Sequence, residues 1–473
     1  MSFPDRNSAR RSKPCGPWDS RRKGHRCQNC RSSRLGCDGG RPCSRCQLRL
    51  LPCPETNETS ERATVVFLGH SIGPVIPEAQ VSSDRDAPYI DSFFAFMELN
   101  SSPFTDPFSR FRLAHFLDES LPVLLVVLSI GRARLHCIEA TSYADPMKTM
   151  SWVPAARNKI RHNLQTIAGT VNPSPETKSL ILALTMLSCI FELMIDSSGY
   201  GAILVLESLP MHVVQSLHIG PLLSQFDIGL LAGYQYIQAA VCLICDQDTF
   251  LAGIQFCEPG ARSELSQNLD TTAACRLSRL LVLLARCNAR SIQWLEQARR
   301  VAQAEPTDVP KPASLQEILG PSLLEFGNAV FENAIEVLEL ADNIRPSPIV
   351  DPVDPQGFSS PLTAFYHCAI ISVARLFTDT LWGAVGKTPA ADEMPHLESH
   401  ALIALAVIER KLVSVGAESV FYLPLITTIA LEIRQKDDKR RVMKILNDVA
   451  LTGFVVARTY KSDMQLAWDL IKN

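Results

Sequence analysis

The chain has 473 residues, enough for two or more folding units, and a hydrophobic content of 46% excludes disorder over most of its length. Residues 1–60 carry 13 Lys and Arg against 5 Asp and Glu, which leaves 33 against 44 in the remainder, so a head of charge +8 precedes a body of charge −11. This asymmetry indicates that the head binds a polyanion and that the body does not.

The cysteines are concentrated near the start of the chain. Six of the 15 fall between residues 27 and 53, and the polar N-terminal residues contain no apolar run of a signal peptide. An odd number of cysteines in such a chain favours reduced thiols inside the cell over a disulfide framework. The longest apolar runs, 121–130 and 179–191, are shorter than the roughly 18–20 residues that cross a bilayer, so we expect core segments and no membrane partner.

Residues 1–26 are rich in Pro, Ser and Arg and lack apolar periodicity, which predicts a disordered basic arm. Two basic clusters separated by a short spacer are typical of a nuclear import signal or of contacts with a nucleic-acid backbone. The simpler alternative is a solvated charged tail. The clusters consist of Arg10, Arg11, Lys13, Arg21, Arg22 and Lys23.

The cysteines of segment 27–53 form two matched halves. In each half, two residues separate the first cysteine from the second and six separate the second from the third. Thiolate ligands and tetrahedral geometry select zinc. One tetrahedral ion would leave two cysteines unused, whereas two ions need eight ligand positions, which six sulfurs supply if two of them bridge. The sequence therefore predicts two zinc ions, with the ligands Cys27, Cys30, Cys37, Cys43, Cys46 and Cys53.

Other chemistry fits this segment less well. A lone C-x2-C pair is compatible with redox catalysis, but two copies with matched third cysteines are not typical of it. A mixed Cys/His finger needs a histidine at ligand spacing, and His25 lies just outside the cluster.

The segment resembles the fungal binuclear zinc-cluster DNA-binding domain. The resemblance rests on the cysteine spacing, with Arg31 after the second cysteine, Arg34 three residues later, Asp38 after the third and Pro42 before the fourth. It implies a small domain of two short helices and loops, in which the first and fourth cysteines bridge the ions. The implied ligand sets are Cys27 and Cys43 as bridges, Cys30 and Cys37 at one ion, and Cys46 and Cys53 at the other.

The same resemblance implies how the domain contacts DNA. A helix over about residues 28–35 would enter the major groove, over a CGG triplet, with Arg34 in place of the usual Lys; Arg can donate two hydrogen bonds to guanine. Ser33 and Gly36 replace residues that are often basic, which should weaken binding and flatten its salt dependence. The further expected contacts, each with a solvated arginine as the alternative, are Arg26, Arg31, Arg41, Arg45 and Arg49.

Residues 54–89 have the composition of a flexible linker, and four prolines predict that no continuous helix or coiled coil forms there. From residue 90 to 473 the pattern changes to apolar residues three and four apart, which predicts one large all-α domain, or two that share an interface. The helical segments are 155–169, 177–194, 273–304, 322–344, 365–385, 396–416 and 438–459.

The body contains no motif of a known catalytic site, so we predict that the protein is not an enzyme. A second C-x2-C pair, Cys242 and Cys245, lies in an apolar helical run, where buried thiols are the favoured interpretation. Single histidines on helices are interpreted in the same way, as core or surface residues. They are His136, His162, His212, His218 and His367.

The body also resembles the fungal-specific transcription factor domain, over stretches such as 197–210, 364–377 and 421–434. In that family the region is regulatory. The leading hypothesis is therefore a nuclear, sequence-specific regulator of RNA polymerase II genes of one metabolic or biosynthetic pathway, with the transcription machinery and, through the body, a second copy as partners. The alternative is a co-regulator or ligand-sensing module with weak DNA binding, motivated by Ser33 and Gly36.

Overall fold

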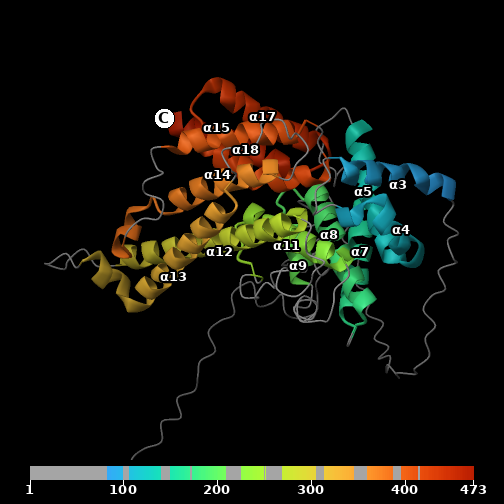
Figure 1. Cartoon of the computed structure of the whole chain (residues 1–473), viewed down its shortest axis with the longest axis horizontal. Coiled ribbons are helices and arrows are strands. Elements are labelled where there is room, and N and C mark those ends of the chain that lie inside the picture. Colours follow the sequence, from blue (N-terminus) through green and yellow to red (C-terminus); the bar gives the residue numbers. More distant parts are fainter. Residues whose placement is uncertain are drawn as a thin grey trace, which may run out of the picture. The chain divides into compact units, whose positions relative to one another are not determined.

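The computed structural model describes residues 83–99, 106–139, 150–170, 173–208, 225–249, 251, 269–304, 314–345, 359–386, 396–413 and 416–472. The chain divides into two units, residues 1–79 and 80–473. All described residues belong to the second unit, and every element that they form is a helix (Figure 1). The described part of the body is thus all-α, as predicted.

The first seven elements are α3 (Ser83–Glu98), η2 (Asp106–Phe108), α4 (Arg110–Glu119), α5 (Leu121–Glu139), α7 (Val153–Ala168), α8 (Pro175–Ile195) and α9 (Tyr200–Glu207). The next five are α11 (Gln225–Ile244), α12 (Leu269–Ala304), α13 (Leu315–Asn343), α14 (Ser359–Leu376) and η5 (Thr380–Ala384). The last five are α15 (Leu397–Lys411), η7 (Ala417–Tyr422), α16 (Leu423–Glu432), α17 (Lys436–Leu451) and α18 (Val456–Lys472).

Helix α8 is buried over most of its length. Its N-cap Ser174 accepts a hydrogen bond from the backbone of Thr177, and Pro175 occupies the first position, where a missing N–H costs nothing. Every residue from Ile181 to Ile195 is buried, since α5, α7, α9 and α11 all pack against this helix. Burial on all sides explains why the segment lacks a polar face.

The two longest helices, α12 and α13, pack side by side (Figure 1). Helix α13 begins with a capping box, in which Ser314 and Glu317 satisfy each other's backbone N–H groups, and it kinks at Gly320, whose φ is 73°. The Trp294 ring of α12 stacks on Trp382 of η5 at 3.8 Å between centroids. This aromatic contact brings η5 onto the long helices.

The C-terminal helix α18 donates side-chain hydrogen bonds to two earlier helices. Trp468 Nε1 donates to the carbonyl of Ala430 in α16 at 2.8 Å, and the Tyr460 hydroxyl donates to the carbonyl of Ile244 at the end of α11 at 3.0 Å. Both donors would be costly to bury without a partner. Together with the shared core, these contacts make the described body one unit rather than two.

Helices α7, α8, α12 and α15 lie where periodicity predicts them, but two predicted segments are interrupted. In 365–385 the α-helix ends at Leu376, and Asp379 then caps the 3-10 helix η5 by accepting from Leu381 N. In 438–459 the break falls at Gly453, whose φ of 117° is accessible to glycine and strained for other residues.

The end of the predicted linker 54–89 is helical, because α3 begins at Ser83 and continues through Pro88. Residues 54–82 lie outside the described residues, so the absence of a continuous helix over the whole linker stays a prediction. Pro88 is the sixth residue of the helix, so it removes one intrahelical hydrogen bond and its ring crowds the carbonyl of Asp84. Burial of Phe93, Phe94 and Phe96, each at most 2% exposed, outweighs that loss.

Two described helices are long and apolar enough to cross a membrane by length and composition. The windows are Leu121–Ile138 and Pro175–Ile195, of which 44% and 89% are buried within the protein. They exceed the apolar runs counted from the sequence because a hydropathy window tolerates a few charged residues. Core helices of soluble proteins pass the same test, so the observation is weak evidence for a membrane.

Candidate functional site

The residues predicted to bind zinc and DNA all lie outside the described residues, as do those of the import signal. The zinc ligands concerned are Cys27, Cys30, Cys37, Cys43, Cys46 and Cys53. The DNA contacts are Arg26, Arg31, Arg34, Arg41, Arg45 and Arg49, and the import residues are Arg10, Arg11, Lys13, Arg21, Arg22 and Lys23. Ligand counting supports the metal, because six thiolates with two bridges match the needs of two tetrahedral zinc ions.

The second cysteine pair of the sequence is structural. Cys242 lies in the last turn of α11, where its sulfur accepts a hydrogen bond from Gln238 Nε2 at 3.2 Å, and Cys245 follows the helix. Burial raises the pKa of each thiol to about 12, so both stay protonated at neutral pH and are poor nucleophiles and metal ligands. Within the described residues no group of three or more ligand-type side chains could hold a metal ion.

His367, interpreted from the sequence as a core or surface histidine, contacts a second histidine in the structure. Its Nδ1 lies 2.9 Å from Nδ1 of His400, a residue of the neighbouring helix α15. Burial, the nearby His400 and the charge of Arg345 lower the pKa of His367 to about 4. The ring is therefore neutral at pH 7. Periodicity could not reveal this pair, because it does not give the rotation of one helix against another.

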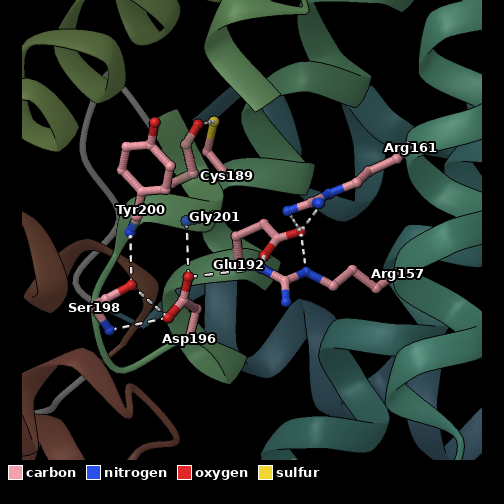
Figure 2. A network of polar contacts seen from close by, with 9 residues as sticks. Arg157, Arg161, Cys189, Glu192, Asp196, Ser198, Tyr200 and Gly201 are labelled. Atoms are coloured by element: carbon pink, nitrogen blue, oxygen red, sulfur yellow. Dashed lines mark hydrogen bonds and ion pairs between the residues drawn. The ribbon is translucent and has the colours of Figure 1, made fainter. Parts of the chain in front are cut away.

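A network of polar contacts in the described body joins α7, α8 and α9 (Figure 2). At its centre Glu192 of α8, with a side chain 2% exposed, accepts from Arg157 Nε at 2.9 Å and from Arg161 Nε at 3.1 Å, both of α7. A carboxylate at this depth needs such partners, since burying an unpaired charge is costly. The two arginines therefore fix the position of α7 on α8.

The same network stabilises the N-terminal end of helix α9. Asp196 accepts from the backbone N–H of Gly201 at 2.8 Å and from the hydroxyl of Ser198 at 2.7 Å. Burial opposes ionisation of Asp196, but the hydrogen bonds from Ser198 and Gly201 outweigh it and lower the pKa. A side chain at Gly201 would displace the ends of the Glu192, Arg157 and Asp196 side chains, so the intact network favours glycine at this position. The polar groups of this network thus bind one another, and the network positions the helices that it joins.

Sequence reasoning missed this network. The available signal was Glu192, a single carboxylate within an apolar run, together with Arg157 and Arg161 four residues apart on one helix face. A buried carboxylate of this kind predicts a basic partner, although the sequence does not say which one.

The N-terminal segment defines the class of protein. Its two matched sets of three cysteines and its excess of basic residues are those of a binuclear zinc domain that binds DNA. Residues 25–63 match the family model described as the fungal Zn(2)-Cys(6) binuclear cluster domain, and the match includes all six cysteines. This domain binds two zinc ions and is found in DNA-binding transcription factors, which are not enzymes and typically act in the nucleus. Neither a curated protein nor a solved structure matches the chain.

Proposed function

We propose that the protein is a sequence-specific transcription factor in which residues 27–53 read CGG-type DNA sites and the helical body controls the output. The observation that carries the proposal is the complete six-cysteine spacing on a basic segment, within the residues matched by the zinc-cluster model. The six cysteines serve as the ligands, with Cys27 and Cys43 bridging. The target genes belong to one metabolic or biosynthetic pathway.

The base contact is assigned to Arg34. A guanidinium that donates two hydrogen bonds to a guanine contributes about 1–3 kcal/mol of discrimination, or roughly 5- to 150-fold in affinity. An arginine that contacts phosphate, such as Arg49, adds affinity without adding specificity. The two roles are separable by experiment because they respond differently to the DNA sequence.

The test uses the full-length, zinc-loaded protein and DNA duplexes with an intact or a scrambled CGG site. Arg34→Ala should reduce the preference for the intact site by roughly 5- to 150-fold, whereas Arg49→Ala should weaken binding to both duplexes about equally. Equal affinity of the wild-type protein for both duplexes refutes the CGG assignment. Genome-wide mapping of bound sites then shows whether the target genes form one pathway.

A second candidate function is a co-regulator or ligand sensor with weak DNA binding. Ser33 and Gly36 favour it, because they remove two positions at which positive charge is common in the family. Each phosphate neutralised contributes about 0.9 to the slope of log affinity against log salt, so this candidate predicts a shallow slope. If Arg34→Ala leaves promoter binding and target expression intact, the second candidate is favoured.

A further inference from the structure

The contact between His367 of α14 and His400 of α15 places two ring nitrogens face to face. Their Nδ1 atoms are 2.9 Å apart, with the ring planes at 72° to each other. An imidazole nitrogen carries either a proton or a lone pair, so this contact is favourable only when one Nδ1 is protonated and the other is not. In any other arrangement of neutral rings, two lone pairs or two protons face each other.

We propose that His367 and His400 together form a binding site for one zinc ion, separate from the cysteine cluster, that links α14 to α15. Imidazole nitrogen is a preferred ligand of zinc. With Zn–N bonds of about 2.0–2.1 Å, tetrahedral geometry places two ligand nitrogens about 3.3–3.4 Å apart. To accept the ion, the two Nδ1 atoms need to separate by about 0.4 Å, and the two rings need to turn so that both lone pairs point at the metal.

The change from the hydrogen-bonded pair to the zinc-bound pair moves one proton from Nδ1 to Nε2 of one ring. In the hydrogen-bonded pair one ring carries its proton on Nδ1 and the other on Nε2. In the zinc-bound pair both rings carry it on Nε2, and both Nδ1 lone pairs point at the ion. A pair of neutral rings changes one tautomer in this exchange and releases no proton. The low pKa of His367 supports the same conclusion, since the neutral ring that binds metal is already the form present at pH 7.

The surroundings limit the affinity of this site. Among the described residues no third histidine, cysteine, aspartate or glutamate completes the group, so water fills the remaining positions. The Arg345 guanidinium lies over the ring of Tyr366 at 5.7 Å, and that ring lies 5.0 Å from the His367 ring. This positive charge opposes a bound cation. We therefore expect zinc to bind here reversibly and more weakly than in the cysteine cluster.

The experiment measures zinc per chain in the tag-free, full-length protein, by equilibrium dialysis against buffered zinc in the micromolar range followed by elemental analysis. The wild-type protein should bind one ion more than the two of the cluster. His367→Ala and His400→Ala should each lose only that extra ion. The control His162→Ala changes an exposed histidine of α7 and should retain it. His400→Asn, which keeps a polar side chain of similar size, should also lose it with unchanged far-UV circular dichroism.

Three results overturn the proposal: a wild-type protein that stops at two ions, an extra ion that persists in both alanine variants, or its equal loss in His162→Ala. None of them bears on the proposed function, because DNA binding by the cluster is measured separately and should be unchanged in all four variants.

Discussion

Removal of the Glu192 side chain tests how the body is held together. In Glu192→Ala, Arg157 and Arg161 lose the carboxylate that both of them contact. Breaking a buried ion pair by removing one partner destabilises a protein by about 3–5 kcal/mol. The two arginine side chains are 22% and 30% exposed and can turn partly toward water. We therefore expect the lower end of that range, a loss of about 3 kcal/mol in the free energy of unfolding.

The assay is urea unfolding of the zinc-loaded full-length protein, followed by far-UV circular dichroism. Glu336→Ala is the matched control, because Glu336 is 47% exposed and pairs at 3.5 Å with Arg279, which is 41% exposed. Surface pairs of this kind contribute about 0–1 kcal/mol. If the two variants unfold with free energies within about 1 kcal/mol of each other, the network does not hold α7 on α8 as argued.

Three further predictions concern separate features. In the same urea assay, Gly201→Ala should destabilise the body by about 1–3 kcal/mol, because a methyl group there collides with two carboxylates. The control Gly383→Ala should change stability by less than about 0.5 kcal/mol, because no atom lies within 4 Å of a side chain added there. The pKa of His367 is about 4 in the folded protein against 6.5 for the free side chain, so the unfolded chain binds more protons between these values. The free energy of unfolding should therefore decrease from pH 6.5 toward pH 4, by up to about 1.4 kcal/mol per pH unit. In His367→Asn this contribution to the pH dependence should be absent when unfolding is measured across the same range. Chelation of zinc should abolish DNA binding in a mobility-shift assay and leave the helical circular dichroism of the body nearly unchanged; a large loss of helix would contradict this prediction.

Helices were predictable where the information is local. Apolar residues three and four apart identify α7 and α12, because the period of a helix requires nothing beyond its own segment. The break at Gly453 was not predictable in this way. A side chain there would approach Met194 of α8 to 2.9 Å, so the tertiary contact favours glycine at a turn that the pattern of residues 438–459 does not show.

Contacts between helices were not predictable, because they depend on how each helix is rotated about its axis. Glu192 meets arginines 31 and 35 residues away, and His367 meets His400 at a separation of 33. Each of these residues could be placed on a helix from the sequence. Its partner could not be identified, because several polar residues on neighbouring helices are equally compatible with the periodicity.

The zinc cluster was more predictable than the body, because the number and spacing of its ligands determine its chemistry. Zinc needs four ligands, six thiolates serve two ions only by sharing, and the ligands lie within 27 residues, so the metal and its number follow from spacing alone. The functional groups of the described body do not come from one segment, and most are already satisfied: Glu192 by two arginines, Cys242 by Gln238. The pair of His367 and His400 is the exception that we identify, because its contact depends on one proton and a metal ion can replace that proton at the same two atoms.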